Sequence, residues 1–356
     1  MNARFLTVLA MITGLLIAGP VQQAIAGPNG GSIAVGDFDG DGDSDVMFKN
    51  NTDNEIAVWM VEDVLIVAGG GFGGLPPTLQ VSGVAFFDDD NISDVLVWDS
   101  ATSDLSVWFM AVDPGTGLAT IGGSSFVGNT GGYEPVAIGQ FNPATDSYPD
   151  VVTRNAATGD LGIWYTDAGN YAGGGFVGNP TTAYDVLGAG DFNNDGVYSI
   201  VFWNDTLKEL AFWELTGNQA PSGAVEIFRG SGFGGLTDHF FLNVTDDMNK
   251  DNKDDLVLQN GAGDLFVWFM TSDAMTPPTI NGFAPTGSAG ANKAVAIGQL
   301  NPGASGDSYP DIFLEDRVGA PGAVNVGAWL LADGLFAGGG FIGAPLDKYA
   351  VANAGE

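Results

Sequence analysis

The sequence contains no cysteine, one histidine, and only 10 lysine and arginine residues against 43 aspartate and glutamate residues. Without cysteine neither disulfide bonds nor thiolate metal sites can stabilise the chain, so an exported form needs a large core, bound metal or both. The formal net charge of −33 repels nucleic acid and anionic membranes and attracts cations. A solvated surface of the halophile type would also explain this acidity, and composition alone does not separate the two. The hydrophobic fraction of 45% argues against disorder.

Long apolar runs are also missing after the first 26 residues, so we expect no membrane insertion of the mature chain. Residues 1–26 contain one cation (Arg4), an apolar run from Phe5 to about Ala18, and then Ala24-Ile25-Ala26. This pattern is typical of a secretory signal peptide with a small-residue cleavage site. A membrane anchor is the alternative, but the run is shorter than the roughly 20 residues that a spanning helix needs. We therefore expect cleavage near Ala26 and a secreted, periplasmic or cell-surface protein.

One acidic segment occurs six times, beginning near residues 37, 88, 140, 191, 247 and 299. After each copy come an apolar run that ends on Asn or Asp, a turn, and a strand-like segment with one tryptophan: Trp59, Trp108, Trp164, Trp213, Trp268 and Trp329. The repeats span about 33–83, 84–135, 136–185, 186–239, 240–293 and 294–348, all within one domain of residues 27–356. Residues 349–356 match the first strand of a repeat again. They would either lie beside the amino-terminal strand, so that the two chain ends close the structure, or begin a seventh unit.

The repeats are also related in threes. The first and fourth share Gly-Phe-Gly-Gly-Leu, the second and fifth share Val-Trp-Phe-Met, and the third and sixth share Val-Ala-Ile-Gly-Gln and Ser-Tyr-Pro-Asp. A block of three repeats therefore looks duplicated, which predicts a pseudo-twofold axis relating repeats one to three to repeats four to six.

Each repeat offers about four short β segments separated by turn residues, and none has a helical period of useful length. Four-strand units at a period of about 50 residues are typical of a β-propeller, whereas β-solenoid coils repeat at about 20–30 residues. The sequence thus predicts an all-β propeller of six four-stranded blades in two three-blade halves, with seven blades as the alternative.

The acidic segments have the ligand types and spacing of calcium loops, because alternate carboxylates can converge on one hard cation while glycine or asparagine makes the tight turn. Calcium is favoured over magnesium because mixed carboxylate, amide and carbonyl oxygens suit a flexible shell. Loops three and six begin with Gln140 and Gln299 and are expected to be structural turns. The candidate ligands are Asp37, Asp39, Asp41, Asp43 (through its carbonyl) and Asp45; Asp88, Asp90 and Asp94; Asp191, Asn193 and Asp195; and Asp247, Asn249, Asp251 and Asp255.

The segment Gly36-Asp37-Phe38-Asp39-Gly40-Asp41-Gly42-Asp43-Ser44-Asp45-Val46, followed by Ala57-Val58-Trp59-Met60, resembles the bacterial FG-GAP/VCBS-type repeats, which are related to the integrin α-subunit propeller repeats. The resemblance covers residues 30–356. It implies a propeller with calcium in loops between the first two strands of some blades, and a role in adhesion or recognition. Phe86 in the second loop and Ser199 in the fourth depart from the pattern.

The six repeated tryptophans are expected to fill the wedges between blades, although sugar stacking is an alternative. A second column comprises Lys49, Trp98, Arg154, Trp203, Gln259 and Glu315, and we expect it to face solvent because it tolerates charge. His239 is expected to be a packing residue, and no nucleophile elbow, phosphate loop or zinc spacing occurs.

These observations favour an exported, calcium-binding, monomeric binding or adhesion module. Loops on the face opposite the metal sites would contact an extracellular protein or glycan. One alternative is a polysaccharide lyase or hydrolase on a propeller scaffold, for which few bases and cations are available. A surface protein without a ligand of its own is the other.

Overall fold

The computed structural model describes residues 31–32, 34–49, 54–219, 225–234, 239–273, 276–300, 309–316, 325–343 and 352–353. All regular secondary structure in these ranges is β-strand. The predicted leader, residues 1–26, and residues 301–308 of the sixth acidic loop lie outside the described residues. In the described ranges no helix is long and apolar enough to cross a membrane.

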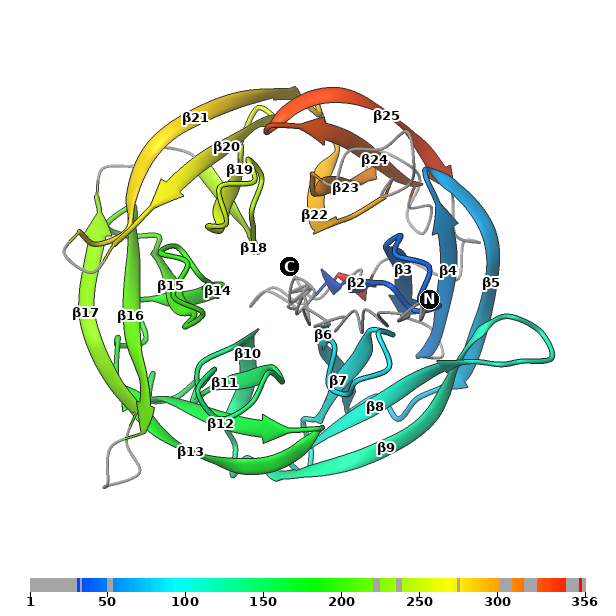
Figure 1. The fold of residues 1–356 in the computed structure, drawn as a ribbon, viewed down its shortest axis with the longest axis horizontal. Helices are drawn as coiled ribbons and strands as arrows, with labels where there is room; N and C mark the ends of the chain where they lie inside the picture. The colour runs from blue at the N-terminus through cyan, green and yellow to red at the C-terminus, as the bar shows by residue number, and fades with distance from the viewer. Residues whose placement is uncertain are drawn as a thin grey trace, which may run out of the picture.

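Six four-stranded antiparallel sheets stand around a ring, and each runs in chain order from its innermost to its outermost strand (Figure 1). The predicted all-β propeller of six four-stranded blades is therefore confirmed. Blades 1 to 3 comprise β2 (Ala34–Gly36), β3 (Asp45–Lys49), β4 (Glu55–Glu62) and β5 (Leu65–Gly74); β6 (Leu79–Ala85), β7 (Asp94–Asp99), β8 (Asp104–Val112) and β9 (Ala119–Asn129); and β10 (Glu134–Gly139), β11 (Asp150–Arg154), β12 (Leu161–Asp167) and β13 (Asn170–Gly178). Blades 4 to 6 comprise β14 (Asp185–Gly190), β15 (Ser199–Asn204), β16 (Glu209–Gln219) and β17 (Val225–Phe233); β18 (His239–Asp246), β19 (Asp255–Asn260), β20 (Asp264–Thr271) and β21 (Thr279–Ser288); and β22 (Lys293–Gly298), β23 (Asp311–Asp316), β24 (Asn325–Ala332) and β25 (Leu335–Gly343).

The burial of the strands follows their place in the blade. The second strand is buried on both faces, as in β11 and β15, because both faces of a blade pack against neighbouring blades. The third strand alternates between buried and half-buried positions, as β4 and β8 do. The core is therefore a series of apolar clusters between adjacent blades and not one central core.

Repeats three apart along the chain lie opposite one another, so blade 1 faces blade 4 across the ring (Figure 1). Blades 2 and 5, and blades 3 and 6, are opposed in the same way. This is the arrangement that a pseudo-twofold relation between two three-blade halves requires.

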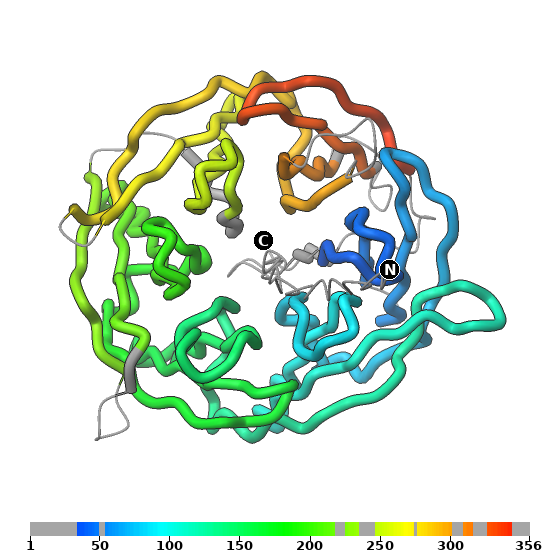
Figure 2. The backbone as a smooth tube through the Cα atoms, viewed as in Figure 1, coloured from blue at the N-terminus to red at the C-terminus, as the bar shows by residue number. Residues whose placement is uncertain are grey.

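The ring closes between blade 6 and blade 1, which lie side by side (Figure 2). Ser44 donates its backbone N–H to the Gln299 carbonyl at 2.5 Å, and Gln299 donates its own to Ser44 Oγ at 2.9 Å. One apolar cluster contains Phe48 from blade 1 and Phe313 from blade 6. Near the chain ends, β26 (Ala352–Asn353) pairs antiparallel with β1 (Gly31–Ser32). The carboxyl-terminal segment thus pairs with the amino-terminal strand, and the described residues form no seventh blade.

The repeated tryptophans pack between blades, as predicted, and each of four lies over a glycine near the end of the preceding blade's outer strand. The pairs are Gly128 with Trp164, Gly178 with Trp213, Gly287 with Trp329, and Gly343 with Trp59. Because the indole lies where a side chain would project, a β-carbon on these glycines would stand 2.7–3.2 Å from the ring. The glycines that close the repeats are therefore required by inter-blade packing.

The prediction that the column from Lys49 to Glu315 faces solvent is wrong. Arg154 and Gln259 are 7% exposed, Trp203 is 9% exposed and Glu315 is 2% exposed. The side chains are polar because they reach the next blade: Arg154 Nη1 lies 3.3 Å from Asp185 Oδ1, and Gln259 Nε2 donates to the Asn292 carbonyl at 2.7 Å. A long side chain that ends in a hydrogen-bonding group can be buried at a seam where an unpaired charge could not.

We expect Gly343→Ala to destabilise the ring at its closing seam. A β-carbon there would lie 2.5 Å from Ile66 Cδ1 and 3.0 Å from Trp59 Cζ3, so the blade 6–blade 1 contact must open. Overpacking of this kind costs about 1–3 kcal/mol, measurable by denaturant unfolding. Gly70→Ala is the control, because its nearest neighbour, Leu118 Cδ1, stands at an ordinary 3.5 Å. Equal unfolding midpoints for the two variants would contradict the role of this contact.

Candidate metal centre

Each acidic loop joins the first and second strands of a blade. Because the strands are antiparallel, these loops lie at the same end of the blades as the turns between the third and fourth strands. Loop one connects β2 to β3, and the described loops two to five occupy the matching positions in blades 2 to 5. The repeat thus places the acidic side chains on one face of the ring.

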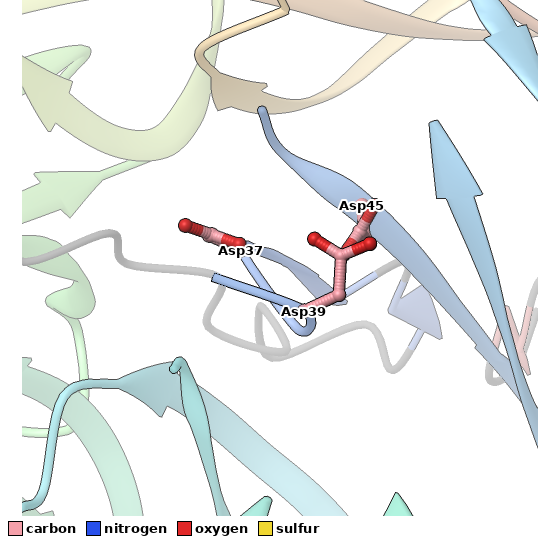
Figure 3. Close-up of side chains that lie close together, drawn as sticks. All are labelled: Asp37, Asp39 and Asp45. Carbon is pink, nitrogen blue, oxygen red and sulfur yellow. The ribbon is translucent and has the colours of Figure 1, made fainter. Parts of the chain in front are cut away.

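Loop one brings three of its predicted ligands together. One carboxylate oxygen from each of Asp37, Asp39 and Asp45 lies within 4.8 Å of the others, and Figure 3 shows the Asp39 carboxylate beside that of Asp45. Asp37 is held by the N–H groups of Gly40 and Gly42, which bond to its two oxygens at 2.6 and 3.0 Å. Both glycines have positive φ angles, 81° and 96°, a conformation that favours glycine, so the turn needs them there.

Asp41 and Asp43 do not join this group. Asp41 Oδ1 accepts the N–H of Asp43 at 2.8 Å, which shapes the turn. The Asp43 side chain is 9% exposed, and its Oδ2 accepts the N–H of Asp63 at 3.0 Å, while its Oδ1 is buried without a hydrogen-bond partner. A buried, unpartnered carboxylate oxygen is costly unless a proton or a cation is close to it. Only the Asp43 carbonyl is predicted as a ligand from the sequence, and this side-chain oxygen was not anticipated.

The electrostatics of loop one are those of a site that lacks positive charge. Burial raises the pKa of Asp45 to about 8, and burial together with the charge of Asp41 raises the pKa of Asp39 to about 6. Burial is also the main cause that raises the pKa of Asp37 and brings that of Asp43 to about 6. No basic residue is among these causes. The residues therefore fit a hard divalent cation, which would keep the carboxylates ionised.

The aspartate that closes the loop has a structural role in five blades. One carboxylate oxygen accepts a backbone N–H from the start of the loop, and the other accepts one from the third strand. The aspartate, which begins the second strand, therefore connects the loop to the third strand. The donors at 2.8–3.1 Å are Phe38 and Val61 to Asp45, Phe87 and Met110 to Asp94, Phe141 and Thr166 to Asp150, Met248 and Met270 to Asp255, and Leu300 and Leu331 to Asp311.

These hydrogen bonds do not exclude a metal, because each carboxylate oxygen has a second lone pair. They do mean that the closing aspartate would be needed in a loop that binds no ion. Burial raises the pKa of Asp150, in loop three, to about 8 although no calcium is predicted there. In blade 4 Ser199 takes this position and is buried.

Loops four and five keep the hydrogen-bonded turn of loop one without its tight carboxylate group. In loop four, Asp191 Oδ2 accepts the N–H of Gly196 at 2.8 Å, and Asn193 Nδ2 donates to Asp195 Oδ2 at 2.9 Å. In loop five the two oxygens of Asp247 accept the N–H groups of Asp251 and Asn252 at 3.0 and 2.6 Å, and Asn249 Oδ1 also accepts that of Asp251. Asp255 is bound to the backbone as described above.

Loop two is the simplest of the predicted sites. Asp88 Oδ1 accepts the N–H of Asp90, and Asp90 Oδ1 accepts that of Ile92. Burial raises the pKa of Asp94 to about 7. Within the part of the chain that the structure describes, the loop-one group is the single set of three such closely spaced carboxylates.

In loop three the side-chain amide of Gln140 makes hydrogen bonds within the loop. Gln140 Nε2 donates to the carbonyl oxygens of Asp146 and Tyr148 at 3.1 and 3.0 Å, and its Oε1 accepts the N–H of Asn142. A side-chain donor thus holds two backbone carbonyls of the loop together. This agrees with the expectation of a structural turn, whereas the corresponding part of loop six lies outside the described residues.

Neighbouring loops are hydrogen-bonded to one another around the ring, which the sequence argument did not predict. Ser93 of blade 2 donates its N–H to the Asp37 carbonyl at 2.7 Å, and Asp37 donates its own to Ser93 Oγ at 3.0 Å. Asp254 and Asp191 repeat this exchange between blades 5 and 4, at 3.0 and 2.6 Å. The residue before the closing aspartate is the sequence signal for these contacts, but only the structure shows that its partner lies in the preceding blade.

The side chain of His239 lies outside the described residues, so its packing role stays a prediction; its backbone begins β18. Comparison with protein-family models finds no match for this chain, and a search of curated proteins finds no matching protein either.

Proposed function

We propose that this protein is an exported, calcium-binding propeller of the FG-GAP/VCBS type that serves as a binding or adhesion module for an extracellular protein or glycan. The calcium assignment rests on the arrangement of the carboxylates in loop one. Three carboxylate oxygens lie within 4.8 Å of one another there, and the buried Asp43 Oδ1 has no hydrogen-bond partner. Asp37, Asp39 and Asp45 would hold the ion, which would supply the missing positive charge and fix the loop to the blade.

Several features support the wider role. The six repeats, the acidic loops between first and second strands, and the leader-like residues 1–26 are those of secreted FG-GAP/VCBS-type proteins, which the sequence resembles. A rigid ring stabilised by metal instead of disulfides suits a recognition surface outside the cell. The fold alone does not assign a ligand, because propellers support many functions.

Calcium titration by isothermal calorimetry tests the metal assignment. We expect saturable binding with a dissociation constant of about 10⁻⁶ M, within the range of protein calcium sites. Asp37→Asn with Asp39→Asn should remove one binding site, because amides cannot offset the ion's charge. Asp146→Asn makes the same change in loop three and should leave the titration unchanged. No calcium binding by the unmodified protein, or the same stoichiometry in the double variant, would reject the proposal.

A further inference from the structure

Five of the six seams between adjacent blades are crossed by the backbone, and one is not. Every blade consists of four consecutive strands, so the outer strand of each blade is followed in the chain by the inner strand of the next blade. Blades 6 and 1 are not consecutive in the chain, although they lie side by side in the ring (Figure 2). We call their contact the 6–1 seam. Because non-covalent contacts hold it, this seam can open while every blade keeps its four strands.

Loop one lies directly at the 6–1 seam. Its Ser44, which is fully buried and directly precedes the predicted ligand Asp45, exchanges two hydrogen bonds with Gln299 of blade 6. The preceding residue, Gly298, approaches so closely that a β-carbon there would stand 2.7 Å from Ser44 Oγ. Closure of the seam therefore depends on where loop one places Ser44.

The same backbone hydrogen bond occurs at three of the seams that the chain crosses. The N–H at the position of Ser44 donates to a carbonyl of the preceding blade at 2.7–3.0 Å, and the pairs are Ser93 with Asp37, Tyr198 with Gln140, and Asp254 with Asp191. Those seams also have a covalent connection, through residues 75–78, 179–184 and 234–238 respectively. The 6–1 seam has the hydrogen bond without the connection, so its closure depends more on the loop.

Loop one is also the loop whose carboxylates lie closest together. One oxygen from each of Asp37, Asp39 and Asp45 lies within 4.8 Å of the others (Figure 3), the single such set in the part of the chain that the structure describes. Ionised carboxylates at this distance repel one another unless a cation lies between them. Asp45 cannot move away from the other two without moving Ser44, which is its neighbour in the chain. An ion that gathers the carboxylates would thus also hold Ser44 against Gln299.

We propose that calcium in loop one controls closure of the ring, because the closed ring binds the ion more tightly than a ring opened at the 6–1 seam. This rests on the calcium assignment of the proposed function and adds what the site regulates. Linkage requires that calcium favours closure and that closure raises calcium affinity by the same factor. Opening would expose the apolar cluster that Phe48 and Phe313 share across the seam, so the exposed cluster would be confined to conditions of low calcium.

Amide hydrogen exchange of the full chain, resolved by residue and measured over a calcium titration, tests the proposal. The reporters are the amides of Ser44 and Gln299, which are hydrogen-bonded across the seam. If the ion binds only the closed ring, their exchange should slow about a hundredfold when calcium exceeds the dissociation constant a hundredfold.

The Ser93 amide is the internal control. It donates to the carbonyl of Asp37, in the same loop one, but across the 1–2 seam, which residues 75–78 connect covalently. Its exchange should therefore slow much less than that of Ser44. Equal slowing at Ser93 and Ser44 would mean that calcium only orders loop one, and would reject control of the seam.

The reciprocal experiment changes the seam and measures calcium affinity by calorimetry, for the binding step that the loop-one double variant described above lacks. Gly343→Ala crowds Trp59 at the 6–1 seam, where no ligand lies, and should weaken this step about tenfold. Gly128→Ala crowds Trp164 at the covalently connected 2–3 seam, with the β-carbon 2.7 Å from the ring, and should leave it unchanged. Circular dichroism checks that both variants fold, and the exchange titration needs neither of them.

The possible results separate this inference from the proposed function. Calcium binding that leaves the exchange of Ser44 and Gln299 unchanged would reject control of closure, while the calcium assignment would stand. Equal weakening of calcium binding by Gly343→Ala and Gly128→Ala would also reject it, because the effect would not be specific to the 6–1 seam. Absence of calcium binding in the unmodified protein would reject both proposals.

Discussion

Replacing Asp150 with alanine should destabilise blade 3 severely whether or not calcium is present. Asp150 is fully buried, and its oxygens accept the N–H groups of Phe141 and Thr166 at 2.9 and 3.0 Å. Alanine would leave both donors buried and unsatisfied at about 1–3 kcal/mol each, so we expect a total loss of about 2–6 kcal/mol. Denaturant unfolding in excess chelator measures this loss.

The controls separate the hydrogen bonds from the charge. Asp150→Asn retains one acceptor oxygen and should fall between the parent protein and the alanine variant. Asp205→Ala removes an exposed carboxylate from a surface ion pair with Lys208 and should have little effect. If Asp150→Ala unfolded at the same denaturant concentration as Asp205→Ala, the closing aspartate would not be the connection between loop and blade.

The calcium-free protein should lose stability as the pH rises from about 4 to about 8. The pKa values of Asp45, Asp150 and Asp255 are each raised by burial to about 8 in the folded chain, against 3.8 for an exposed aspartate. Between these values the folded state binds more protons than the unfolded state, so its stability is full at low pH and decreases as the pH rises. Each group contributes up to about 1.4 kcal/mol per pH unit. Thermal unfolding in chelator across this range measures the slope.

Calcium should oppose this loss by stabilising the ionised carboxylates. We expect calcium to raise the melting temperature more at pH 8 than at pH 5, because at pH 5 protons compete for the ligands. At a thousandfold excess over the dissociation constant, one site contributes about 4 kcal/mol. Asp150→Asn should reduce the pH slope in chelator and leave the calcium increment unchanged, since loop three holds no predicted ion. A calcium increment that is equal at both pH values would contradict this linkage.

The sequence by itself determined the repeat and the blade. Six copies of one pattern predicted six four-stranded sheets, because each tryptophan strand and acidic turn has a fixed place in its own blade. Loop chemistry was also local: Asp37, Gly40 and Gly42 lie within six residues, and their turn follows from glycine's backbone freedom and carboxylate hydrogen bonds. The structural turn that we expected in loop three, which begins with Gln140, is local for the same reason.

Only the tertiary structure determined the contacts between blades. Whether Arg154 and Gln259 face solvent or the next blade depends on a partner about 30 residues away. Their polarity alone therefore led to the wrong prediction that they are exposed. The exposure of aromatic rings on the outer strands was not predicted either: Phe176 on an outer strand and Phe202 on a second strand are the same residue type and opposite in burial. The closing pair Ser44 and Gln299 is 255 residues apart. The sequence of one repeat determines the strands and turns within its own blade. The burial of a side chain depends on the adjacent blade that covers it, and that blade is in place only in the closed ring.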